Sequence, residues 1–112
     1  MPSEKRRFGD IGENEAERFL LQKGFKIVGK NYRIKNIGEI DLIAVKGGQI
    51  VFFEVKTRNV KRGTNFPIEF SINKRKLSIL KKICHLYLIE NKLPFNQKWR
   101  VDGLFIEGNP EN

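Results

Sequence analysis

The sequence predicts an α/β protein in which a mixed β-sheet is flanked by helices, with the elements in the order αβββαβ. Two observations carry this prediction. Apolar residues recur at helical spacing at about residues 10–23 and 73–91, and strand patterns surround the second of these segments, three before it and one after it. Helices separated by strands favour a sheet covered by helices, and 112 residues allow one domain with a single core.

The chain is expected to begin with a basic, flexible arm at residues 1–9. The first helix should follow from about Asp10 to Lys23, because its apolar residues form one stripe and Gly24 is a good C-terminal stop. The stripe consists of Ile11, Ala16, Phe19 and Leu20. A strand is then expected from Phe25 to about Arg33.

Two more strands are predicted at about Glu39–Val45 and Gln49–Arg58. They are joined by Lys46-Gly47-Gly48, a strong hairpin signal, which makes the strands antiparallel neighbours. Asp41 and Glu54 lie about equally far from this turn, so the geometry allows the two side chains to meet.

Alternation sorts the side chains of this hairpin, because residues two apart on a strand share a face. On the first strand, Glu39 and Asp41 are expected on one face, and Ile40 and Leu42 on the other. The second strand is expected to present a charged face and an apolar face, formed by Glu54, Lys56 and Arg58 and by Val51, Phe53 and Val55.

The segment from Asn59 to about Phe70 is basic and irregular, which predicts a loop. Ser71 or Asn73 can cap a second helix that runs to about Asn91. Its expected core face consists of Leu77, Leu80, Cys84, Tyr87 and Leu88. A final strand is expected from Trp99 to Ile106.

The chain is strongly basic, with 22 lysine and arginine residues against 13 aspartate and glutamate residues and a net charge of +9. This excess of positive charge favours a polyanionic partner such as nucleic acid, and an acidic membrane surface is the alternative partner. The charge could also serve only to keep the protein soluble. A run of charge is also typical of a solvated face. The candidate phosphate-binding residues are Arg58, Lys61, Arg62, Lys74, Arg75 and Lys76.

A single cysteine, Cys84, excludes an intramolecular disulfide and suits a reducing cytoplasm. No apolar run follows the basic residues at the N-terminus, so the sequence indicates neither a signal peptide nor a membrane span. We therefore expect a soluble, cytoplasmic protein.

The charged residues of the hairpin suggest a metal-binding or catalytic site, because buried strands rarely contain charged side chains unless these are paired, metal-bound or catalytic. Asp41 and Glu54 offer the oxygen ligands that Mg²⁺ prefers. Lys56 shares a face with Glu54 and could orient a water or stabilise the transition state of phosphodiester cleavage. The competing interpretation is an ion pair between Glu54 and Lys56 on a solvated face.

Glu13 lies beside the apolar stripe of the first helix rather than opposite it, which is an unusual place for a carboxylate. The helix macrodipole offers a structural explanation, since it favours an acid in the first turn.

In this order, the charged residues resemble those of the PD-(D/E)xK nuclease superfamily: an acid on the first helix, Asp on one strand and Glu-x-Lys on the next. More specifically, the chain is similar to the YraN family of small bacterial proteins. The matching stretches run from about Gly9 to Ile106 and are GDIGENEAERFL, NYRIKNIGEIDLIAV, VFFEVKTR and WRVDGLFIE.

The resemblance implies a restriction-endonuclease-like core, of the kind found in Holliday-junction resolvases, and metal-dependent cleavage of nucleic acid. Asp41 and Glu54 would bind Mg²⁺ or Mn²⁺, Lys56 would serve catalysis, and Glu13 would be a supporting acid. Glu39 belongs to the matched motif without an assigned role.

We therefore expect a nucleic-acid-binding endonuclease, with branched or flapped DNA as the candidate substrate. A homodimer is a reasonable assembly, because resolving a junction needs two cuts. Two alternatives stay open: a non-catalytic nucleic-acid-binding module that retains the nuclease fold, and a scaffold with a merely basic surface.

Overall fold

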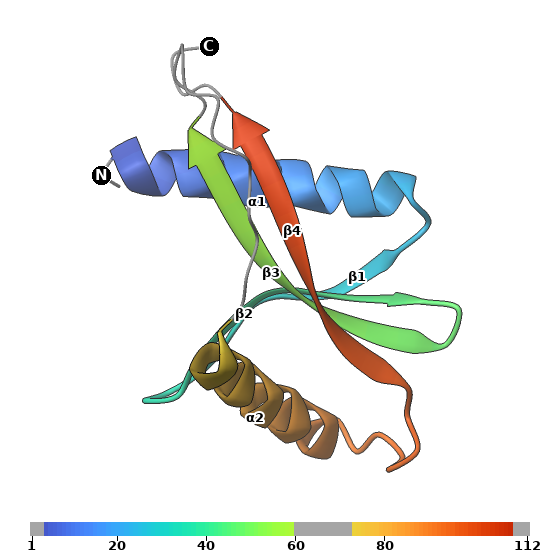
Figure 1. Ribbon diagram of the computed structural model, residues 1–112. Coiled ribbons are helices and arrows are strands. Elements are labelled where there is room, and N and C mark those ends of the chain that lie inside the picture. The colour runs from blue at the N-terminus through green and yellow to red at the C-terminus, as the bar shows by residue number, and fades with distance from the viewer. Residues whose placement is uncertain (1–3, 60–72, 109–112) are drawn as a thin grey trace.

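The computed structural model describes the backbone of residues 4–59 and 73–108 and the side chains of residues 11–57 and 73–107. Its elements follow one another in the order αβββαβ, which confirms the prediction (Figure 1). They are α1 (Glu4–Gln22), β1 (Lys26–Ile34), β2 (Gly38–Lys46), β3 (Gln49–Asn59), α2 (Lys74–Glu90) and β4 (Trp99–Gly108). Within these residues, neither helix is long and apolar enough to cross a membrane.

The strands form one mixed sheet in the order β1-β2-β3-β4. β1, β2 and β3 are antiparallel neighbours, whereas β4 runs parallel to β3. A parallel neighbour needs a crossover connection, and α2 lies in the connection between β3 and β4. The α/β fold with a mixed sheet flanked by helices is therefore confirmed, and it is consistent with a restriction-endonuclease-like core.

The two helices pack on different faces of the sheet, so the buried residues form two cores (Figure 1). The α2-side core consists of Ile40, Ile43, Ile50, Phe52, Leu80, Ile83 and Cys84. The α1-side core consists of Ala16, Leu20, Leu42, Ala44, Val51 and Phe53, with Val55 packed against it. The predicted apolar face of β3 is thus confirmed, and both faces of β2 and β3 are buried near their hairpin.

The local signals at three element ends are confirmed. Gly47 and Gly48 have φ values of 59° and 75°, as a two-residue type I′ hairpin requires. Gly24, with a φ of 90°, follows the end of α1. At the start of α2, Asn73 Oδ1 accepts a hydrogen bond from the backbone N–H of Lys76 at 2.8 Å and caps the helix.

The first helix begins at Glu4, so the flexible arm predicted for residues 1–9 is wrong for residues 4–9. Glu, Lys and Arg in this segment favour helix, and a search for apolar periodicity overlooks such a turn. Residues 1–3 lie outside the described residues, as do residues 60–70 of the expected loop and the alternative cap Ser71. Asn59 is the last residue of β3.

The alternation of side chains along β2 breaks at Asp41. Ile40 packs in the α2-side core and Leu42 in the α1-side core, so the prediction that these two share a face is wrong. Across from this point on β1, Asn31 has a φ of 51°, in the left-handed region. Such an irregularity disturbs the ladder and re-aims neighbouring side chains, which period-two reasoning does not anticipate.

Gly12 of α1 lies so close to β3 that a Cβ at this position would stand 1.7 Å from Thr57 Cγ2. Replacing a helix-interior glycine with alanine ordinarily gains up to about 1 kcal/mol, but here the overlap outweighs that gain. We expect Gly12→Ala to lower the free energy of unfolding by roughly 1–3 kcal/mol, measured by urea denaturation. The control, Gly12→Ala with Thr57→Ser, removes the overlapping methyl and should recover most of the loss. A Gly12→Ala variant as stable as the wild type would contradict the close approach.

Candidate functional site

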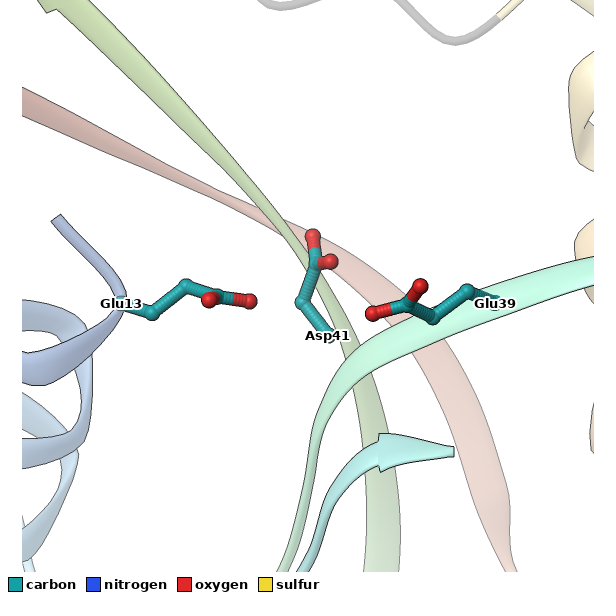
Figure 2. A group of neighbouring side chains, drawn as sticks. All are labelled: Glu13, Glu39 and Asp41. Atoms are coloured by element: carbon teal, nitrogen blue, oxygen red, sulfur yellow. The ribbon is translucent and has the colours of Figure 1, made fainter. Parts of the chain in front are cut away.

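Three carboxylates gather between α1 and β2. One oxygen each from Glu13, Glu39 and Asp41 lies within 4.8 Å of the other two. Glu13 and Glu39 point toward Asp41 from opposite sides (Figure 2). The structure therefore brings two of the predicted site residues together and adds Glu39, which the matched motif contained without a role.

Close packing of α1 on the sheet delivers Glu13 to this group. Ala16 and Leu20 are completely or almost completely buried in the α1-side core. Glu13 precedes Ala16 by three residues and so stands on the same side of the helix. Gly12 permits the close approach of the helix backbone to Thr57. The other two members of the predicted apolar stripe, Ile11 and Phe19, are exposed, so the stripe is only half confirmed. Burial of Ala16 and Leu20 is what fixes the carboxylate of Glu13 over β2.

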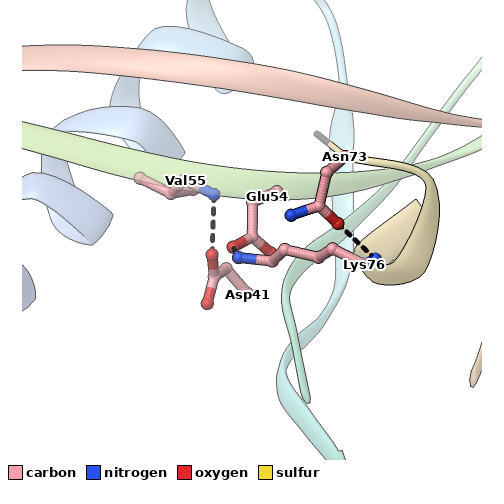
Figure 3. A network of polar contacts seen from close by, with 5 residues as sticks. All are labelled: Asp41, Glu54, Val55, Asn73 and Lys76. Carbon is pink, nitrogen blue, oxygen red and sulfur yellow. Dashed lines mark hydrogen bonds and ion pairs between the residues drawn. The ribbon is translucent and has the colours of Figure 1, made fainter. Parts of the chain in front are cut away.

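Asp41 lies where β2 and β3 separate. Their paired register ends at Leu42↔Phe53, and just beyond it Asp41 Oδ2 accepts a hydrogen bond from the Val55 backbone N–H at 2.6 Å (Figure 3). The side chain thus satisfies an amide at a point where the ladder between the two strands has ended. This bond holds the Asp41 carboxylate in a half-buried position among the other acids.

Burial raises the pKa of Asp41 from 3.8 to about 7. The hydrogen bond from Val55 lowers this pKa, whereas the negative charges of Glu54, Glu13 and Glu39 raise it further. Near neutral pH, the arrangement therefore favours a positive charge, either a proton on Asp41 or a cation beside it.

Asn31 of β1 reaches the same acids, and the sequence reasoning missed it. With its amide nitrogen toward them, Asn31 donates hydrogen bonds to Glu13 Oε1 at 3.0 Å and to Glu39 Oε1 at 2.8 Å. The sequence carries only a weak signal for this role. Asparagine tolerates the left-handed φ found here, but asparagines are also common where no such strain exists.

An open pocket of about 240 Å³ lies beside the acids. Its lining comes from α1, β1 and β2 and consists of Glu13, Asn14, Glu17, Lys30, Asn31, Asp41 and Leu42. An ion pair between Lys30 Nζ and Glu17 Oε2, at 2.7 Å, ties β1 to α1 at this pocket. The space admits a cation together with several waters.

Glu54, expected to join Asp41 as a metal ligand, lies close to it but contacts Lys76 of α2 (Figure 3). Lys76 Nζ lies 2.5 Å from Glu54 Oε1, and the Glu54 side chain is only 14% exposed. Glu54 pairs with Lys76 and, among the described residues, not with Lys56, whose side chain is exposed. The sequence placed Lys76 only among the cations that could grip phosphates, because nothing local distinguishes it from its neighbours at the start of α2 or indicates a contact with Glu54.

The predicted phosphate-binding residues are only partly described. Lys74 and Arg75 are exposed in the first turn of α2. Arg75 also lines a second open pocket, of about 370 Å³, to which Glu39 contributes. This pocket therefore adjoins the acids on the side of α2. Only the backbone is described for Arg58, and the remaining candidates outside the described residues are Lys61 and Arg62.

Comparison with known proteins identifies a family. The model of the uncharacterised protein family UPF0102 matches residues 12–106. The chain is 38% identical over 102 residues to a UPF0102 protein of Chloroflexus aurantiacus, covering 91% of this chain and 80% of that protein. It is 49% identical over 87 residues to one of Clostridioides difficile (76% and 72%) and 40% identical over 104 residues to one of Carboxydothermus hydrogenoformans (92% and 84%). UPF0102 is the YraN family, so the resemblance seen in the sequence is confirmed.

The raised pKa of Asp41 predicts that the protein without metal loses stability as the pH rises. An acid with a pKa of about 7 when folded and 3.8 when unfolded binds more protons in the folded state. Its contribution is therefore complete below pH ~4 and is lost as the pH rises through ~7. In buffer with a chelator, the free energy of unfolding of the wild type relative to Asp41→Asn should fall by roughly 1–2 kcal/mol over that range, allowing for partial exposure. Urea denaturation at a series of pH values measures this difference.

A matched control is Asp102→Asn, which removes a carboxylate of β4 whose ion-pair partner is Arg100. This variant should follow the pH dependence of the wild type. A constant difference between the wild type and Asp41→Asn across the range would show that burial and neighbouring charges do not perturb Asp41.

Proposed function

The chain belongs to the uncharacterised protein family UPF0102, and we propose that it binds nucleic acid and hydrolyses phosphodiester bonds as a Mg²⁺- or Mn²⁺-dependent endonuclease. One observation carries this proposal: carboxylates from α1 and β2 converge beside an open pocket, with Asp41 half buried among them. Converging carboxylates repel one another, and a bound cation relieves that repulsion.

Glu13, Glu39 and Asp41 are the residues that would hold the ion, and Glu54 lies near enough to act on Asp41 through its charge. The donor set fits Mg²⁺ or Mn²⁺, because it consists of oxygen atoms. When bound, such an ion would polarise a phosphoryl oxygen and lower the pKa of an attacking water.

The remaining tasks fall to side chains of β3 and to backbone contacts. The Val55 amide holds one oxygen of Asp41, which fixes the direction of the carboxylate. Lys56 follows Glu54 by two residues on β3 and has an exposed ammonium group. We assign Lys56 the catalytic role of contacting the substrate phosphate, where its charge would stabilise the transition state.

The charge of the chain supports nucleic acid as the substrate. A net charge of +9 favours a polyanion and implies binding that weakens as salt is raised. Lys74 and Arg75 begin α2, and Arg75 and Glu39 line the same pocket, so phosphates held there would lie next to the acids. Branched or flapped DNA is the proposed substrate class, and a homodimer is the proposed assembly for paired cuts.

A second candidate function is a nucleic-acid-binding module without turnover. The ion pair between Glu54 and Lys76 favours it, because this pair occupies one of the expected metal ligands. The two functions differ in one observable: only the endonuclease forms a metal-dependent product.

The direct test incubates the protein with duplex, flapped, branched and single-stranded substrates in the presence of Mg²⁺ or Mn²⁺. We expect nicked or cleaved product from the wild type and a loss of at least about 100-fold in rate for Asp41→Ala, because this change removes a ligand and an oriented charge. Binding in chelator, measured by fluorescence anisotropy, should be retained by Asp41→Ala.

Asp102→Asn is again the matched control, and its cleavage rate should stay within about twofold of the wild type. Cleavage by Asp41→Ala at the wild-type rate would contradict the endonuclease assignment. Salt-sensitive binding without product under every condition would support the non-catalytic module, and no binding at low salt would exclude both.

A further inference from the structure

Lys76 is a second lysine at the site, and it comes from a different element than Lys56. Figure 3 shows its side chain reaching from the first turn of α2 to Glu54, next to Asp41. Lys76 Nζ lies 2.5 Å from Glu54 Oε1. The second helix therefore supplies a cation to the same place to which the first helix supplies Glu13.

The two side chains of this ion pair differ in their exposure to solvent. The Glu54 side chain is 14% exposed, and that of Lys76 is 44% exposed. A largely buried carboxylate needs a positive partner, whereas an exposed ammonium on a flexible stem can leave one partner for water or another anion at small cost. The base of Lys76 is nonetheless fixed, because its backbone N–H donates to Asn73 Oδ1 at 2.8 Å.

We infer that Lys76 is an exchangeable counter-ion of Glu54: it neutralises Glu54 when the acids hold no metal, and it is released toward a substrate phosphate when a divalent cation takes its place. This inference rests on the proposed function. Glu54 is thereby a metal ligand that is screened in the metal-free protein, and Lys76 is a positioning residue that sets the metal affinity.

The surroundings of Lys76 support this exchange. Lys76 lines the pocket of about 370 Å³ on the α2 side, together with Arg75, Asn73 and Glu39. Glu39 also belongs to the acid group, so the pocket and the acids are continuous. A released ammonium therefore stays beside the acids and next to a second cation, where a phosphate of the same nucleic-acid strand can bind both.

The test measures Mn²⁺ binding, without nucleic acid, by isothermal titration calorimetry. Lys76→Gln should bind Mn²⁺ about tenfold more tightly than the wild type, because a competing charge is removed near the ion. Lys76→Arg, which keeps the charge, should bind no more tightly. Lys82→Gln removes the same charge from an exposed position of α2 and should leave the affinity unchanged. In buffer with a chelator, Lys76→Gln should be less stable than the wild type. Added Mn²⁺ should raise the melting temperature of Lys76→Gln by more than it raises that of the wild type.

Glu54→Gln provides a variant that does not depend on how well Lys76→Gln folds. It should weaken Mn²⁺ binding by about tenfold or more, and wild-type affinity in this variant would overturn the exchange. Unchanged or weaker binding by Lys76→Gln would also overturn it, as would equal tightening by Lys82→Gln. If the wild type binds Mn²⁺ and cleaves nucleic acid but the variants give one of these contradicting results, only the counter-ion role of Lys76 fails. If the wild type binds no Mn²⁺, the proposed function fails as well.

Discussion

The hydrogen bond from the Val55 amide to the Asp41 carboxylate stands at the point where the pairing of β2 with β3 ends. Two strands that part in this way leave amides and carbonyls without ladder partners, and one carboxylate satisfies an amide there. The same contact keeps Asp41 half buried, where desolvation raises its pKa to about 7. The split in the sheet and the perturbed acid are thus one feature of the fold.

The two helices meet this feature from different faces of the sheet. α1 packs through the α1-side core and carries Glu13 to Asp41, while α2 packs through the α2-side core and carries Lys76 to Glu54. A sheet that packs against a helix on each face holds both helices in fixed positions, so charges from distant parts of the chain converge. The site is for this reason a consequence of core packing, and Gly12 permits the close approach of α1 to β3 at the turn of the helix that carries Glu13.

Much of the fold follows from local chemistry in the sequence. Gly47 and Gly48 require a hairpin, Gly24 ends a helix, and the alternation of β3 assigns its apolar face correctly. The site was harder to predict, because it depends on where regular structure fails. Strict alternation could not anticipate that the side chains of β2 switch faces at Asp41, so that Ile40 and Leu42 lie on opposite faces of the sheet. No local sequence pattern indicates a contact between elements as far apart in the chain as β3 and α2. The place of Glu39 among the acids and the pairing of Lys76 with Glu54 therefore emerged only from the three-dimensional arrangement.

We propose that these acids hold a divalent cation, and anomalous diffraction from a crystal of the protein soaked in Mn²⁺ would locate the ion. We expect an anomalous difference peak at coordination distance from carboxylate oxygens of Asp41 and of Glu13 or Glu39, with Glu54 turned toward the ion and Lys76 turned away from Glu54. A map with no peak at these carboxylates, in a crystal where the ion pair between Glu54 and Lys76 is intact, would contradict it.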